Sequence, residues 1–178
     1  MAGAEWLLFI YKVPSEPSTK RVLVWRRLKR LGALQLHDGV YLLPRTDRTL
    51  EQLQWLQAEV LEIGGETSLW EAEPLPPDRR RYEEQFNRQL EASYARVAAA
   101  AGEILAHLEQ GGLGPDGLGQ CEQAYHAASR NYLALRATDY LASPAGAAAR
   151  AALEACSGAL REAVEGQHVA RRPRGGQS

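Results

Sequence analysis

The spacing of hydrophobic and polar positions changes several times along the N-terminal part of the chain. Residues 5–13 form an apolar run rich in aromatic and branched side chains, which predicts a buried strand that ends at Pro14. In residues 18–31, Val24 and Leu28 recur at helical spacing. This pattern predicts a helix with one apolar face on a core and its remaining charged positions outside.

Two short apolar runs, residues 33–37 and 40–44, flank Asp38-Gly39. An Asp-Gly pair in a two-residue loop tolerates the positive φ angles of a tight turn, so these runs predict a β-hairpin. His37 and Asp38 are also residue types that acid–base catalysis uses. The turn accounts for both of them without any chemistry, and we favour that interpretation.

A second helical pattern begins at Thr46 or Asp47, either of which can cap a helix, and continues to about Ile63. Residues 66–73 then have the composition of a strand. The resulting order is strand, helix, strand, strand, helix, strand. This order predicts an α+β fold, a ferredoxin-like βαββαβ domain over residues 1–77, in which two helices cover one face of an antiparallel sheet.

After a proline-rich linker the pattern becomes entirely helical. A Gly-rich turn and the pair Ser143-Pro144 divide this part into a three-helix appendage. The helices are expected at residues 79–110, 119–141 and 145–165. We therefore predict a helical region over residues 78–166 and, from its polar composition, a disordered tail over residues 167–178.

The overall composition is that of a soluble globular protein: 178 residues, 45% hydrophobic, 24% charged, with a net charge of −1. No apolar run approaches the roughly 18 to 20 residues that span a membrane, so no membrane association is expected. Two cysteines, Cys121 and Cys156, suit a reducing compartment. These features predict a cytoplasmic protein.

The sequence contains no motif that predicts an enzyme. We find no Gly-rich phosphate loop and no nucleophile elbow. His107, His126 and His168 show no ligand spacing with one another or with the cysteines, so neither a metal site nor a cofactor is predicted.

The small net charge conceals two oppositely charged segments. Residues 1–48 contain nine Lys and Arg against four Asp and Glu, whereas residues 49–77 contain six Glu and no basic residue. Such an arrangement can direct a polyanion to one face of the molecule, or it can pair two copies of the chain. The charge pattern alone leaves both interpretations open.

The densest cluster of positive charge lies on the first predicted helix. Several exposed Lys and Arg on one helix face supply sequence-independent affinity for the phosphates of nucleic acid. A solvated outer face is the simpler alternative. If the helix binds DNA, the expected contact residues are Arg21, Arg26, Arg27, Lys29 and Arg30, flanked by Arg45 and Arg48.

One later segment, residues 130–144, is unusual for a helix because it combines charged and aromatic side chains. Arg136 and Asp139 lie three residues apart, and an Arg and an Asp at this spacing pair along a helix. We therefore expect a local ion pair there rather than a binding site.

The run from Trp6 to Pro44, continued by residues 48–73, resembles the N-terminal region of the ChrB family, the bacterial chromate-resistance regulators. Residues 130–144 also resemble the helical part of that region. The stretch that contains the predicted hairpin, residues 26–44, is also similar to the central ferredoxin-like domain of the phenylacetate-type repressors. The positions that carry the ChrB resemblance are Trp6, Tyr11, Pro14, Arg21, Trp25, Arg26, Leu28, Lys29, Gly32, Ala33, Leu36, Asp38, Leu43, Pro44, Gln54, Trp55, Leu56, Glu59, Gly64, Gly65 and Trp70.

This resemblance implies a cytoplasmic transcriptional regulator that binds double-stranded promoter DNA of chromate-resistance genes and is released by chromate. We expect it to act as a homodimer. Full-length members of the family continue into a second domain to which chromate sensing is assigned, whereas this chain ends at Ser178. We therefore expect a stand-alone or truncated module, with sensing left to a separate protein. The alternative is a dimerisation or protein-interaction module without DNA affinity of its own.

Overall fold

A computed structural model describes residues 5–14 and 18–171. The chain divides into two compact units, Met1–Phe86 and Asn87–Ser178. The sequence pattern places the boundary earlier, between residues 77 and 78. The difference arises because the first turns of the helix that follows the linker pack on the N-terminal unit, where the rings of Trp6 and Phe86 lie 5.5 Å apart.

The N-terminal unit contains six elements in the order that the sequence predicts. They are β1 (Trp6–Lys12), α1 (Ser18–Arg30), β2 (Leu34–His37), β3 (Val40–Pro44), α2 (Asp47–Glu62) and β4 (Glu66–Ala72). The four strands form one antiparallel sheet in the order β2-β3-β1-β4. The prediction of an α+β fold is therefore confirmed.

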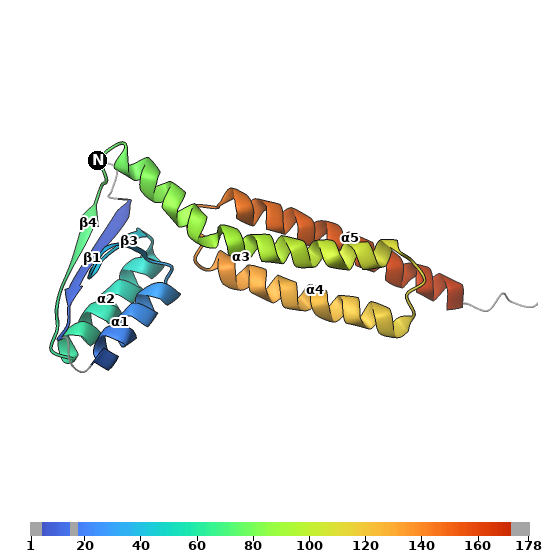
Figure 1. Cartoon of the computed structure of the whole chain (residues 1–178), viewed down its shortest axis with the longest axis horizontal. Helices are drawn as coiled ribbons and strands as arrows, with labels where there is room; N and C mark the ends of the chain where they lie inside the picture. Colours follow the sequence, from blue (N-terminus) through green and yellow to red (C-terminus); the bar gives the residue numbers. More distant parts are fainter. Residues whose placement is uncertain (1–4, 15–17, 172–178) are drawn as a thin grey trace, which may run out of the picture. The chain divides into compact units, whose positions relative to one another are not determined.

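Alternation along β1 explains how the helices lie on the sheet. Leu7 and Phe9 point to one face and are fully buried. Helices α1 and α2 cover this face (Figure 1) and contribute Val24 and Leu28 from α1 and Leu53 from α2 to the core. Because Val24 and Leu28 lie one turn apart, they fix the rotation of α1 about its axis and turn its charged positions outward.

The Asp-Gly turn joins β2 to β3 and also touches β1. Gly39 has φ +71° and accepts a hydrogen bond of 2.8 Å from the amide of Tyr11. A Cβ atom on Gly39 would lie 2.3 Å from the carbonyl oxygen of Tyr11. The hairpin prediction is confirmed, and glycine is required there both for the backbone conformation and for the space.

Helix α2 begins with a reciprocal cap. Thr46 Oγ1 accepts a hydrogen bond from the Thr49 amide (3.0 Å), and the Thr46 amide donates to Thr49 Oγ1 (2.9 Å). The Thr49 hydroxyl also donates to the carbonyl of Pro44 at 2.7 Å. Of the two caps that the sequence allows, the structure uses Thr46 rather than Asp47.

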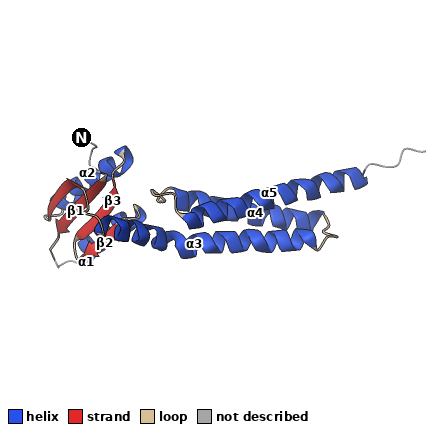
Figure 2. Ribbon diagram, turned by 90° about the horizontal axis from the view of Figure 1, so that it is seen from above, coloured by secondary structure: helices blue, strands red, loops and turns tan. Residues whose placement is uncertain are grey.

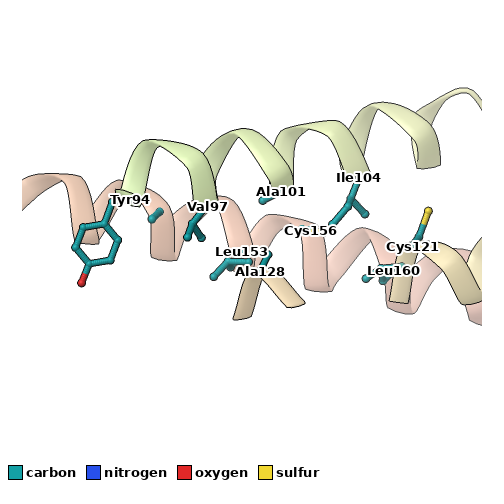
Figure 3. Close-up of a cluster of buried hydrophobic side chains, with 10 residues drawn as sticks. Tyr94, Val97, Ala101, Ile104, Cys121, Ala128, Leu153, Cys156 and Leu160 are labelled. Carbon is teal, nitrogen blue, oxygen red and sulfur yellow. The ribbon is translucent and has the colours of Figure 1, made fainter. Parts of the chain in front are cut away.

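The second unit is helical. It contains most of α3 (Asp78–Glu109), then α4 (Pro115–Arg136) and α5 (Pro144–Arg171). These three helices lie side by side (Figures 1 and 2). The side chains of Val97, Ala101 and Ile104 on α3 point toward α5 within the buried cluster of this unit (Figure 3).

The expected range 119–141 for α4 is wrong at both ends. The helix starts at Pro115 because proline, which lacks an amide hydrogen, suits the first helical turn. It ends at Arg136 because the chain turns back to form the start of α5. Ser143 donates two hydrogen bonds to the carboxylate of Asp139, one from its backbone amide (2.9 Å) and one from its hydroxyl (3.2 Å). The hydroxyl of Tyr94 donates a third (3.0 Å).

Helix α5 continues past its expected end at residue 165 into the segment predicted to be disordered. Its last described residue is Arg171, and residues 172–178 of that predicted tail lie outside the described part. The side-chain Nε2 of Gln167 donates a hydrogen bond of 2.7 Å to the backbone carbonyl of Leu113, which ties this end of α5 to the α3–α4 connection. No helix in residues 18–171 is long and apolar enough to cross a membrane.

Candidate nucleic-acid interface

The five basic residues predicted on the first helix are all exposed, and they are spread round α1: Arg21 lies on the side of the β2–β3 hairpin, and Arg27 and Arg30 lie on the side of α2. They form a surface that we call the basic face. Helix α1 contains no acidic residue, and its last turn is rich in basic side chains, which the negative end of the helix dipole favours. The members of the basic face are Arg21, Arg26, Arg27, Lys29 and Arg30.

Two members of the basic face already have partners within the chain. A guanidinium nitrogen of Arg27 lies 2.9 Å from Oε1 of Glu59 on α2. The ammonium of Lys29 lies 4.9 Å from the ring centroid of Trp25, a distance typical of a cation–π contact. The carboxylate of Glu59 offsets the charge that Arg27 presents to an external anion, whereas the neutral ring of Trp25 holds the ammonium of Lys29 in place without removing its charge.

The other three members are uncommitted. Arg21, Arg26 and Arg30 form no ion pair with any residue that the structure describes. Arg26 and Arg30 are one helical turn apart, so their Cα atoms are separated by roughly 6 Å along the helix axis. These arginines are therefore the members of the basic face best able to bind separate phosphates.

Arg45 and Arg48, the two flanking contact residues that the sequence predicts, lie outside α1 and are not members of the basic face. Nε of Arg45 lies 2.7 Å from Oε1 of Glu71 on β4, and this hydrogen bond raises the pKa of Arg45 above its ordinary value. Arg48 is exposed on the first turn of α2. The structure thus places Arg45 in an ion pair with the sheet edge rather than on the basic face.

Apolar side chains are interleaved with the arginines of α1. Val22, Leu23 and Trp25 are 41, 44 and 41% exposed. The sequence pattern does not predict this exposure, because hydrophobic residues at these positions count toward a buried face as readily as an outer one. A surface that mixes guanidinium groups with apolar side chains can contact the phosphate and sugar of a nucleic acid, or an acidic protein surface.

A pocket of about 470 Å³ lies beside the first half of α1. The sequence pattern does not reveal it, because three separate segments build it. Its phenols, Tyr11 and Tyr41, stack with ring centroids 6.0 Å apart. Burial, followed by the electrostatic effect of Tyr11, raises the pKa of Tyr41 to about 12, and burial also raises the pKa of Tyr11. Its lining residues are Tyr11, Lys12, Val13, Arg21, Val22, Trp25, Gln35, Asp38, Gly39 and Tyr41.

Comparison with known proteins identifies the family. A family model described as "Protein ChrB, N-terminal" matches residues 21–172. The chain belongs to this family. The match confirms the resemblance drawn from the sequence motifs. Because it begins at Arg21 and continues nearly to the end of the chain, the ChrB N-terminal match includes all seven predicted contact residues and every helix from α2 to α5.

Protein ChrB of Cupriavidus metallidurans is 32% identical to this chain over 87 residues. The aligned part is 48% of this chain and 27% of that relative, so the chain spans well under two thirds of the relative's length. No solved structure matches this ChrB-family chain.

Proposed function

We propose that this chain is a DNA-binding regulatory module of the chromate-resistance type. The observation that carries the proposal is the basic face, of which Arg21, Arg26 and Arg30 are exposed and form no ion pair with an acidic residue in the described part of the chain. A DNA duplex carries one phosphate charge per about 1.7 Å of its axis, so arginines one helical turn apart can each neutralise a phosphate. Family membership supports the same assignment.

The contacts assigned to the basic face concern phosphates only. Phosphate contacts position a protein on the duplex, whereas base contacts determine which sequence it prefers. We assign no residue to base recognition. Sequence preference, where it is measured, therefore has to come from the shape of the DNA or from side chains that reorient on binding.

We further propose a ferredoxin-like N-terminal domain that forms a homodimer through the sheet. The strand order β2-β3-β1-β4, with two helices on one face, supports the fold assignment. β4 is an edge strand whose outer side can pair with a second copy, and its Trp70 is 59% exposed.

Release by chromate belongs, in this proposal, to another domain or a separate protein. The aligned ChrB relative is much longer than the matched part. We propose no chromate-binding residue in this chain.

The test compares binding of the purified chain to its own upstream DNA and to a scrambled duplex, by fluorescence anisotropy. The variant replaces Arg26, Arg27 and Arg30 with Ala. A matched control removes the same number of charges from exposed positions of the second unit, Arg88, Arg150 and Arg161. Binding to both duplexes that falls in the first variant and persists in the control supports the proposal, because phosphate contacts contribute to affinity whatever the base sequence. Equal losses of DNA affinity in both variants would mean that binding depends only on the net charge of the chain, which would contradict the proposal.

The second candidate is a protein-interaction module without DNA affinity. The exposed Val22, Leu23 and Trp25 favour it, since apolar side chains at these exposures suit a protein interface. Salt distinguishes the two candidates. Binding through several phosphates weakens steeply between about 50 and 200 mM salt, whereas an apolar helix interface does not. Weak and equal binding to both duplexes would favour this candidate.

A further inference from the structure

The pocket beside α1 is an open hollow bounded by three elements of the N-terminal unit. Its walls come from the end of β1, the first half of α1 and the β2–β3 hairpin. The hydrogen bond from the Tyr11 amide to the Gly39 carbonyl, 2.8 Å long, holds the hairpin against β1. The stacked rings of Tyr11 and Tyr41 form part of its lining. A cavity of this volume lies within the range of about 300 to 1,000 Å³ that small-molecule sites occupy.

The charged groups of this pocket favour an anion. Two cations, Arg21 and Lys12, line it, against one carboxylate, that of Asp38. Arg21 forms no ion pair within the described part of the chain, so its guanidinium keeps its capacity for a bidentate contact with an acidic group. The amide of Gln35 adds a further hydrogen-bonding group.

The remaining lining favours a flat apolar body. Trp25 supplies an indole that is 41% exposed, and Val13 and Val22 supply aliphatic surface. Both phenols are protonated at neutral pH, as a tyrosine of ordinary pKa is, and burial raises their pKa values further. Tyr11 and Tyr41 also hydrogen-bond to each other, so one of the two hydroxyls is left to donate a hydrogen bond to an anion. A bare tetrahedral oxyanion would leave most of about 470 Å³ unfilled.

We propose that this pocket binds a small organic anion with a planar apolar body, whose acidic group contacts Arg21 and Lys12 and whose ring lies against Trp25 and the two tyrosines. The site is independent of the DNA contact proposed above, because binding of such a ligand needs no duplex. Arg21 belongs to both surfaces, however, so an occupied pocket withdraws one cation from the basic face.

The experiment is a nitrogen-15 NMR titration of the full chain with naphthalene-2-sulfonate as the probe. Two reference compounds separate the two halves of the ligand: inorganic sulfate, which lacks the ring, and 2-naphthalenemethanol, which lacks the charge. We expect saturable shifts of the Trp25 indole and the Gly39 amide with the sulfonate. Each reference compound should bind at least about tenfold more weakly, the alcohol because it lacks the charge-assisted contact and sulfate because it lacks the apolar contact of the ring.

A matched pair of variants tests the assigned residue. Arg21→Gln removes a cation that lines the pocket, whereas Arg26→Gln removes an equally exposed cation of the same helix that does not. The first should weaken naphthalenesulfonate binding about tenfold, and the second should leave it unchanged within about twofold. The proposal is overturned by the absence of saturable shifts, by shifts centred on Trp55 or Trp70 instead, by equal effects of the two variants, or by sulfate binding as tightly as the sulfonate.

Discussion

The guanidinium of Arg27 lies 2.9 Å from the carboxylate of Glu59, although 32 residues separate them. This ion pair connects the basic face of α1 to the acidic helix α2. It also divides the predicted contact residues into two classes, because Arg27 has a carboxylate partner whereas Arg26 and Arg30 have none among the described residues. The three arginines are close in the sequence, yet they do not offer the same charge to DNA.

Single substitutions should reveal this division. Arg26→Ala should lower the slope of log affinity against log salt by about 0.9, the loss of one phosphate contact, while Arg27→Ala should lower it less. Glu59→Gln should increase DNA affinity, because it releases Arg27. The measurement is fluorescence anisotropy with duplex DNA at several salt concentrations. If Arg27→Ala is as damaging as Arg26→Ala and Glu59→Gln has no effect, the division is wrong.

The hairpin turn should tolerate no side chain at Gly39. Gly39→Ala should destabilise the N-terminal unit by about 2–5 kcal/mol, because the overlap of the new Cβ with the carbonyl oxygen of Tyr11 (about 1–3 kcal/mol) adds to the backbone strain at a positive φ (about 1–2 kcal/mol). Gly64→Ala is the matched control. Gly64 also has a positive φ, +78°, but nothing lies within 4 Å of the place that its Cβ atom would take, so only the backbone strain of about 1–2 kcal/mol remains.

Urea unfolding followed by tryptophan fluorescence measures this difference, because all four tryptophans lie in the N-terminal unit. If Gly39→Ala and Gly64→Ala lower the free energy of unfolding equally, the close approach of residue 39 to Tyr11 contributes nothing to the cost of the substitution.

A second glycine pair tests the packing of the helical unit. A Cβ atom on Gly146 would lie 2.7 Å from Oδ2 of Asp139 and 3.1 Å from the ring of Tyr94. Gly146→Ala should therefore destabilise this unit by about 1–3 kcal/mol. Gly158→Ala, on the same helix with open space around it, should be neutral or stabilising, since alanine is the better helix former. Circular dichroism at 222 nm during urea unfolding distinguishes the two, and a neutral Gly146→Ala would contradict the structure.

Tyr41 should make the N-terminal unit sensitive to high pH. Burial raises its pKa from 10 to about 12, so the folded state holds the phenolic proton more tightly than the unfolded state does. The stabilisation is complete below pH 10 and is lost as the pH rises from about 10 to 12. Tyr41→Phe should therefore show a shallower fall of the free energy of unfolding over this range, measured by tryptophan fluorescence. Parallel curves for the two proteins would contradict the assignment.

Local patterns are sufficient to predict the elements of the N-terminal unit. Three of these patterns depend only on neighbouring residues, and the structure agrees with each prediction. They are the Asp38-Gly39 turn, the cap at Thr46 and the helical spacing of Val24 and Leu28. The exposure of the basic face follows from the burial of Val24 and Leu28, so it too is predictable from a single helix.

Contacts between distant segments are not predictable in this way. The spacing predicts that Asp139 pairs with Arg136, which it approaches at 3.8 Å. Asp139 instead accepts its closer hydrogen bonds from the backbone of Ser143 in the adjacent turn and from the phenol of Tyr94, 45 residues away. Likewise the Glu59 partner of Arg27 depends on how two helices pack together, which no spacing within either helix specifies.

The measurement that tests the central claim most directly is an amide NMR titration of the nitrogen-15-labelled chain with its upstream DNA duplex. The account predicts that the largest shifts fall on the outer side of α1, from Arg21 to Arg30, and that they diminish at higher salt. Shifts concentrated on α4 and α5, or no shifts at all at low salt, would show that the basic face does not bind DNA.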